Sequence, residues 1–129
     1  MITSLHTMIY SDDPPATRAF LRDVLEWPFV EDHMSEPGWL IFKSGPSEMG
    51  VHPTHCSWDG KDYNYPKHHS IILMCEDIDA TVEELKAKGA EFVGEVEDHG
   101  YGWVIQMVVP AAGEMQLYQP NHPLAYTLP

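Results

Sequence analysis

The chain repeats one series of landmarks twice, about 64 residues apart. The landmarks are an Asp-x-x-Ala-Thr motif, a Gly-Trp pair followed by two aliphatic residues, and a Glu-Met pair; they begin at Asp13, Gly38 and Glu48 and recur at Asp77, Gly102 and Glu114. Because order and spacing are both kept, the repeated unit is a complete supersecondary structure and not a short solenoid repeat. Two such units fill the 129 residues, so equivalent positions would line a site between them.

Length and composition indicate one globular domain. A chain of 129 residues with 43% hydrophobic residues can bury a substantial core. The apolar runs are too short to span a membrane, and the first residues lack the basic start and apolar stretch of a signal peptide. We therefore expect a cytoplasmic protein in which Cys56 and Cys75 are free thiols, since no disulfide framework is visible.

The charge balance narrows the range of partners. Twenty acidic residues against seven lysines and arginines give a net charge of −13 with histidine neutral. Such a surface repels phosphate backbones and anionic lipids, so neither nucleic acid nor a membrane is an expected partner. Eight histidines are many for this length and raise the question of a metal ion. Four of them lie among polar loop residues and are expected at the surface: His33, His55, His99 and His122.

Both units, residues 1–52 and 68–120, predict the order strand–helix–strand–strand–strand. In the first unit we expect a helix over 16–27 and strands over 5–10, 29–30, 38–42 and 48–52. In the second we expect a helix over 80–88 and strands over 68–74, 90–93, 103–109 and 115–118. Residues 53–67, which contain two prolines and a glycine, are predicted to be a linker, and residues 121–129 an extended C-terminal arm.

Two βαβββ units in one structural domain define the expected fold class. A four-stranded sheet with one helix leaves its second face bare. Two such sheets can pair at their edges, which predicts an α+β protein whose curved mixed sheet surrounds a cavity. A binding or catalytic site is expected in that cavity.

Four segments carry a resemblance to a known family: residues 6–12, 16–27, 77–89 and 113–118. Together they resemble the vicinal oxygen chelate superfamily, which includes glyoxalase I, bleomycin-resistance proteins, fosfomycin-resistance enzymes and extradiol dioxygenases. The resemblance covers nearly the whole chain and implies the glyoxalase/bleomycin resistance/dioxygenase fold. It also implies a homodimer, since two-unit members commonly pair. It does not choose a reaction, because one fold hosts many functions.

The resemblance also implies where a metal ion would bind. Members with a metal take ligands from the first and last strands of each unit, and the matching positions here are His6, Gly50, Ser70 and Gln116. Glycine has no ligand atom, and a one-residue bulge would bring His69 into the place of Ser70. The implied ligands are therefore His6, His69 and Gln116. A divalent ion such as Zn, Fe, Mn or Ni and no metal at all both remain open.

Two further polar residues share strand faces with these positions. His52 lies two residues beyond Gly50, and Glu114 lies two residues before Gln116, so each pair points to the same side of its strand. We expect His52 in the wall of the cavity as a substrate contact. Glu114 is the candidate catalytic base.

Aromatic residues could line the same cavity. Trp39 and Trp103 are repeat mates on the middle strands, where large aromatics usually pack in the core. Alternatively, they form a stacking wall for a flat ligand, joined by Phe42, Tyr101 and Tyr118.

Two functions follow from the resemblance. The first is a metal-dependent enzyme, either a lyase of the glyoxalase type or a dioxygenase, whose substrate chelates the ion through two oxygens. The second is a metal-free protein that binds and sequesters a drug or an aromatic metabolite. Gly50 at an expected ligand position favours the second, and the number of histidines favours the first.

Overall fold

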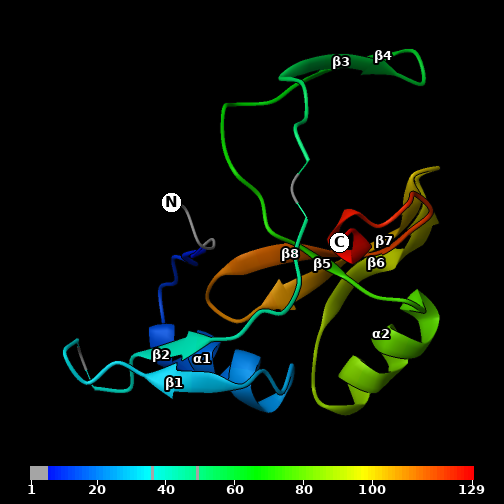
Figure 1. Cartoon of the computed structure of the whole chain (residues 1–129). Coiled ribbons are helices and arrows are strands. Elements are labelled where there is room, and N and C mark those ends of the chain that lie inside the picture. The colour runs from blue at the N-terminus through cyan, green and yellow to red at the C-terminus, as the bar shows by residue number, and fades with distance from the viewer. Residues whose placement is uncertain (1–5, 36, 49) are drawn as a thin grey trace.

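The computed structural model describes residues 6–35, 37–48 and 50–129 (Figure 1). Its helices are α1 (Pro14–Asp23), α2 (Ile78–Ala87) and the short 3-10 helix η1 (Ala125–Thr127). Its strands are β1 (Phe29–Glu31), β2 (Leu40–Phe42), β3 (His55–Trp58), β4 (Lys61–Asn64), β5 (Ile72–Met74), β6 (Phe92–Asp98), β7 (Gly102–Val109) and β8 (Gly113–Pro120). In the described residues, no helix is long and apolar enough to cross a membrane.

The central sheet has the strand order β5-β8-β7-β6. Strand β5 runs parallel to β8, whereas β6, β7 and β8 are antiparallel neighbours. The second unit therefore has the predicted β-α-β-β-β order, but its first strand covers 72–74 and not 68–74, and its second covers 92–98 and not 90–93. The remaining strands form two separate antiparallel pairs, β1 with β2 and β3 with β4.

Both helices begin at the repeated Asp-x-x-Ala-Thr motif. The Asp13 side chain accepts a hydrogen bond from the Ala16 N–H at 3.1 Å, and the Asp77 side chain accepts one from Ala80 at 3.0 Å. Each aspartate therefore satisfies one of the backbone donors that a helix start leaves unpaired, which is the role of an N-cap. The landmark that reveals the duplication thus has the same physical function in both copies.

The glycines of the Gly-Trp landmark serve different purposes in the two units. Gly38 has open space around it but adopts a φ of +78°, a conformation that disfavours any other residue. Gly102 lies at the start of β7, where a Cβ atom would stand 2.5 Å from the Gln119 backbone oxygen and 3.0 Å from the Tyr118 ring. At this second site glycine permits the close approach of β7 and β8.

One hydrophobic core lies between the helices and the central sheet. Its buried residues come from α1 (Phe20, Leu21), α2 (Ile78, Val82, Leu85), β7 (Ile105, Met107, Val109) and β8 (Met115, Leu117). Thr17 ties α1 to the second unit, because its hydroxyl donates to the Pro110 carbonyl at 2.6 Å. The two units therefore share a core.

The opposite side of β7 and β8 carries polar side chains. Register pairs on this side are Val104 with Tyr118, Gln106 with Gln116, and Val108 with Glu114. Successive residues of a strand point to opposite faces, so these six side chains lie away from the core residues Ile105, Met107 and Leu117. Neither α1 nor α2 covers this side, and we call it the helix-free face of the sheet.

The mixed α+β class is confirmed, with two α-helices and curved sheets, but the first unit differs from its prediction. Residues 6–10 of the expected strand 5–10 do not pair in a sheet, and Met8 and Tyr10 are exposed. Residues 48 and 50–52 of the expected strand 48–52 are likewise irregular. Leu5 and Met49, which belong to these two expectations, lie outside the described residues. A strand needs a neighbour to satisfy its backbone groups, and the sequence pattern alone does not supply one.

Two other boundaries also need correction. Helix α1 ends at Asp23, not at Trp27, because the backbone leaves the helical path and Glu26 takes a φ of +56°. The predicted linker 53–67 contains the β3–β4 hairpin. Its turn is Asp59-Gly60, with φ angles of +52° and +71°, which is the dipeptide and conformation of a tight two-residue hairpin. The Asp-Gly dipeptide is a sequence signal for such a hairpin.

Candidate functional site

A hollow of about 440 Å³ opens on the helix-free face. Residues 8–10 and 69–72 form one side of it, and Gln106, Glu114 and Gln116 from β7 and β8 form the floor. The volume falls within the range of small-molecule sites, which is about 300–1,000 Å³. The floor exists because Gln106 and Gln116 are register partners on adjacent strands, with Glu114 two residues away on the same face.

The structure brings together some of the residues implied as metal ligands. His69, Glu114 and Gln116 all line the hollow, and so does Ser70. His6 is exposed and does not line it. Across residues 6–35, 37–48 and 50–129, no three His, Cys, Asp or Glu side chains converge as a metal site would require. A divalent ion in such a site needs three or more protein ligands, and the implied set of His6, His69 and Gln116 does not converge within a single chain, because His6 lies outside the hollow.

Gln116 is held in place by a tyrosine from the turn between β6 and β7. Its side-chain amide nitrogen donates to the Tyr101 hydroxyl at 3.2 Å. Tyr101 in turn meets the edge of Tyr118, with ring centroids 6.1 Å apart. The floor of the hollow is therefore continuous with a group of aromatic rings on the same face.

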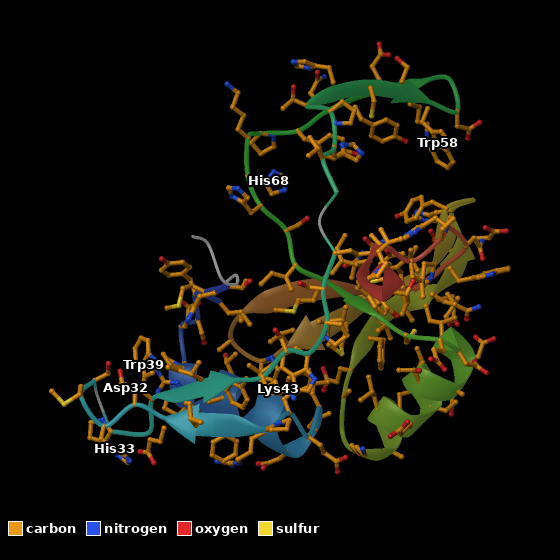
Figure 2. All side chains as sticks on the ribbon, viewed as in Figure 1. Asp32, His33, Trp39, Lys43, Trp58 and His68 are labelled. Atoms are coloured by element: carbon orange, nitrogen blue, oxygen red, sulfur yellow. The ribbon has the colours of Figure 1, made fainter. Side chains whose placement is uncertain are left out.

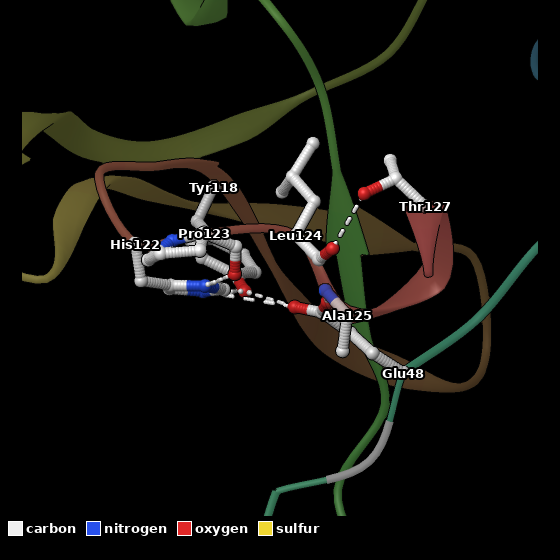
Figure 3. Close-up of polar contacts among 7 residues, drawn as sticks. All are labelled: Glu48, Tyr118, His122, Pro123, Leu124, Ala125 and Thr127. Atoms are coloured by element: carbon white, nitrogen blue, oxygen red, sulfur yellow. Dashed lines mark hydrogen bonds and ion pairs between the residues drawn. The ribbon is translucent and has the colours of Figure 1, made fainter. Parts of the chain in front are cut away.

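A polar cluster lies at the end of this face, where the C-terminal segment crosses β8 (Figure 3). The Tyr118 hydroxyl lies 2.9 Å from His122 Nε2 and 3.4 Å from Glu48 Oε1. Glu48 Oε2 accepts a hydrogen bond from the Ala125 N–H at 2.8 Å, and its Oε1 lies 3.6 Å from His122 Nε2. We refer to these three side chains as the Glu48–Tyr118–His122 cluster. It ties residues from both units and from the predicted arm 121–129 to one another.

The direction of the hydrogen bonds in this cluster follows from its geometry. His122 Nδ1 lies 2.8 Å from the Pro123 carbonyl, which can only accept, so Nδ1 carries a hydrogen. The Tyr118 hydroxyl donates to Glu48 Oε1 at 3.4 Å and also lies within hydrogen-bond distance of His122 Nε2, at 2.9 Å. Burial, and after it the negative charge of Glu48, raises the pKa of Tyr118. The phenol therefore keeps its proton at neutral pH and serves as a donor.

Trp39, Phe42 and Trp103, three of the residues predicted to form an aromatic wall, do not come together. Trp39 lies beside β2 under the Arg18 guanidinium, 4.8 Å from its ring centre (Figure 2). Phe42 packs against Phe29 and the core. Trp103 lines a different hollow at the start of α2, opposite Gln119 on the core side of the sheet.

His52 and Tyr118, the other two residues predicted to contact substrate, also lie apart. His52 is exposed on the segment before β3, where its ring meets the edge of Tyr65 with centroids 5.2 Å apart. Tyr118 lies on the helix-free face next to Gln116, and its ring meets the edge of Tyr101, the other tyrosine of the predicted wall. The stacking wall of Trp39 and Trp103 thus stays a prediction without a shared cavity to support it.

Sequence reasoning missed several residues of this face. Gln106 and Glu48 were not singled out, and His122 was expected to be an ordinary surface group. The signals were present: Glu48 is the repeat mate of Glu114, and Gln106 is the single polar residue of the otherwise apolar predicted strand 103–109. His122 remains partly exposed, yet it is hydrogen-bonded to a buried tyrosine.

The fold is that of a small α+β protein with an open hollow on one face of its sheet. Residues 3–109 match the model of the Glyoxalase/Bleomycin resistance protein/Dioxygenase superfamily. The chain belongs to this superfamily, as the landmark segments indicated.

The chain is also similar to one protein in sequence and to two solved structures in fold. The uncharacterized protein YetH of Bacillus subtilis (strain 168) is 26% identical over 111 residues, which cover 82% of this chain and 89% of YetH. The antibiotic binding protein TnmS3 from Streptomyces sp. CB03234 superposes with a TM-score of 0.58 at 13% identity, covering 94% of this chain and 99% of TnmS3. Lactoylglutathione lyase from Agrobacterium tumefaciens superposes with a TM-score of 0.59 at 16% identity, covering 91% and 92%. At identities this low, the two superpositions show that this chain has the same fold as the two solved structures, and they show no shared activity.

Proposed function

We propose that this protein binds a small organic molecule, a drug or an aromatic metabolite, in the hollow on the helix-free face and needs no metal ion to do so. The observation that carries the proposal is the floor of the hollow, where the amides of Gln106 and Gln116 stand beside the carboxylate of Glu114. Met8 and Ile72 add apolar surface at the sides. A few convergent polar groups fix the orientation of the ligand in small-molecule sites.

The lining also indicates which ligands the hollow favours. Among the described residues that form it there is a carboxylate but no lysine or arginine. The whole chain carries a net charge of −13, so an anionic ligand would be repelled. Ligands that donate hydrogen bonds or carry a positive charge are favoured. One solved protein of the same fold is named an antibiotic binding protein, in keeping with this use of the fold.

Calorimetric titration of EDTA-treated protein with a panel of aromatic fragments tests the proposal. We expect E114Q to weaken the best fragment about tenfold or more, since a hydrogen bond to a charged group contributes about 1.5–3 kcal/mol. E83Q is the matched control, because Glu83 is an exposed carboxylate on α2, remote from the hollow. Equal affinities of E114Q and E83Q for every fragment would count against the hollow as the binding site.

A metal-dependent lyase or dioxygenase is the second candidate, favoured by the presence of His69, Glu114 and Gln116 around one hollow. In that case His69 and Gln116 would hold the ion together with His6, and Glu114 would serve as the base. Because His6 lies outside the hollow, the chain would have to rearrange on binding. Native mass spectrometry after exposure to Zn, Fe, Mn or Ni checks this: one retained ion per chain, lost in H69A, would favour the enzyme over the metal-free binding protein.

We further infer that two chains pair as a homodimer. Several apolar side chains of the first unit are almost fully exposed in the single chain, namely Tyr10 at 88%, Met34 at 95% and Val51 at 98%. Large exposed apolar surface marks interaction sites in soluble proteins. Sedimentation equilibrium should give twice the chain mass of 14.6 kDa; a monomer at micromolar concentration would contradict the inference.

A further inference from the structure

The β3–β4 hairpin projects from the rest of the chain and contributes no side chain to the core. Every residue from 50 to 70 is exposed or only partly buried, and Figure 1 shows the hairpin separated from the central sheet. Hydrogen bonds between its two strands hold it together, extended by one from the Tyr65 N–H to the Thr54 carbonyl at 2.8 Å. A two-stranded hairpin without further packing is only marginally stable in water. This hairpin therefore needs a surface to pack on.

The two faces of the hairpin differ in character. Residues paired across the strands share a face, and successive residues of one strand alternate between faces. One face is largely aromatic, and its side chains are those of Cys56, Trp58, Lys61, Tyr63 and Tyr65. The other face is polar, and its side chains bond across the strands in two pairs, His55 with Asn64 and Ser57 with Asp62. We call the first of these the aromatic face of the hairpin.

The aromatic face is open to solvent in the single chain. Tyr63 and Tyr65 stack on each other, with ring centroids 6.4 Å apart and planes 8° apart, and Tyr65 remains exposed. Trp58 meets the ring of His99 in the turn between β6 and β7, yet it is 60% exposed (Figure 2). Contiguous exposed aromatic surface of this kind marks an interaction site.

The charge of this part of the chain indicates what covers the aromatic face. Residues 52–69 contain two aspartates, two lysines and four exposed histidines, so their net charge is zero with histidine neutral. The remaining residues contain 18 of the 20 acidic side chains and five of the seven lysines and arginines, so they carry the whole net charge of −13. A neutral hairpin with Lys61 on its aromatic face is complementary to an acidic surface. The rest of this same chain is such a surface.

We propose that the aromatic face of each β3–β4 hairpin packs against a second copy of the chain. This inference rests on the homodimer inferred above and names the surface that forms it. Val51, which is 98% exposed, lies on the segment that leads to the hairpin, so the exposed apolar surface of the first unit continues into it. In a two-fold dimer the contact forms twice, because each chain both supplies a hairpin and receives one. Lys61 then meets carboxylates of the other chain, and Trp58 is removed from water.

Sedimentation equilibrium of variants on the two faces tests the proposal. W58A/Y63A should raise the dimer dissociation constant about tenfold or more, because tryptophan and tyrosine dominate interface energies and each substitution acts twice in a symmetric dimer. S57A is the matched control, since Ser57 lies on the polar face of the same strand; it should leave the dissociation constant unchanged. Circular dichroism checks that the variants keep the fold, which the exposure of Trp58 leads us to expect.

Two further measurements separate a specific contact from general charge repulsion. K61E and K43E change the net charge equally, but Lys61 lies on the aromatic face and Lys43 follows β2. We expect K61E to weaken the dimer more than K43E does. In a co-refolded mixture of ¹⁴N- and ¹⁵N-labelled chains, carbodiimide should couple Lys61 of one isotope to carboxylates of the other.

Two results would overturn the inference. The first is an equal dissociation constant for the wild type and W58A/Y63A, and the second is coupling of Lys61 only within chains of one isotope, which means that the hairpin folds back on its own chain. Failure of the homodimer looks different, because the wild type would then sediment as a monomer. A dimer that M34A weakens and W58A/Y63A does not keeps the homodimer and refutes the role of the hairpin. Ligand binding in the hollow is measured independently through E114Q.

Discussion

Replacing Tyr118 by phenylalanine removes one hydroxyl from the Glu48–Tyr118–His122 cluster and leaves the ring in place. In the folded protein this hydroxyl donates to Glu48 Oε1 at 3.4 Å and lies 2.9 Å from His122 Nε2. The variant therefore tests whether the cluster holds the C-terminal segment against β8. It does so without creating a large cavity.

The expected loss follows from the exposure of the two partners. One neutral hydrogen bond contributes about 1 kcal/mol, and a group left buried without its partner costs about 1–3 kcal/mol. His122 is 38% exposed and can bind water instead, whereas Glu48 is only 15% exposed and is harder to rehydrate. We expect Y118F to lower the free energy of unfolding by about 1–2 kcal/mol. The midpoint of thermal unfolding should then fall by about 4–8 °C for a chain of this length.

Urea unfolding followed by circular dichroism at pH 7.5 measures the change. Y10F is the matched control, because Tyr10 is 88% exposed and its hydroxyl faces water. A double-mutant cycle of Y118F with E48Q should give a coupling energy of about 0.5–1 kcal/mol. If Y118F and Y10F are equally stable, or if the cycle shows no coupling, the cluster does not form in solution as described.

The remaining predictions concern alkaline stability, helix starts and strand approach. Burial raises the pKa of Tyr118, so the folded state holds the phenolic proton more tightly than the unfolded state does. The resulting contribution to the free energy of unfolding is complete below about pH 10, the ordinary pKa of tyrosine, and is lost as the pH rises through the pKa of the folded state. Alkaline unfolding of Y118F should accordingly be shallower than that of the wild type, and identical pH profiles would contradict the shift. D13A and D77A should each cost about 1 kcal/mol in urea unfolding, whereas D79A, which removes an exposed first-turn acid with no cap bond, should cost less; equal losses would refute the cap assignment. G102A should cost about 1–3 kcal/mol because its Cβ meets the Gln119 backbone oxygen, and a neutral effect would show that β7 and β8 separate readily.

The second unit was predictable from sequence because its signals are local. Asp77 caps α2, Gly89 follows the helix with a φ of +97°, and the apolar residues of β7 and β8 alternate as a half-buried sheet requires. The same alternation placed Glu114 and Gln116 on one face, and both line the hollow. Where the structure-determining interactions lie within a few residues of one another, the sequence pattern was sufficient.

The first unit was harder because its strands depend on distant partners. Residues 6–10 have a strand-like pattern, but pairing is a long-range event that the pattern cannot guarantee. The hairpin at Asp59-Gly60 was missed for the opposite reason: its local turn signal was present, and the prolines around it were given more weight.

The candidate site also has a part that local sequence signals predict and a part that depends on long-range contacts. The floor of the hollow follows from strand alternation, whereas the cluster around Tyr118 joins residues 70 positions apart in the chain. Trp39 and Trp103 show that a sequence repeat does not by itself predict a shared site. They are repeat mates in sequence, yet one packs under Arg18 beside β2 and the other lies at the start of α2. Equivalent positions in a duplication share a local structure and need not share a site.

The central claim is that the helix-free face binds a small molecule without a metal ion, and glutamine side-chain NMR tests it most directly. In ¹⁵N-labelled, EDTA-treated protein, addition of an aromatic fragment should shift the side-chain amide signals of Gln106 and Gln116, which form the floor of the hollow. Gln119 is an internal control, because its side chain accepts a hydrogen bond from Ile78 on the core side. Shifts at Gln106 and Gln116 with Gln119 unchanged are the result we predict. Shifts that appear only after Zn, Fe, Mn or Ni is added, or that affect Gln119 alone, would contradict it.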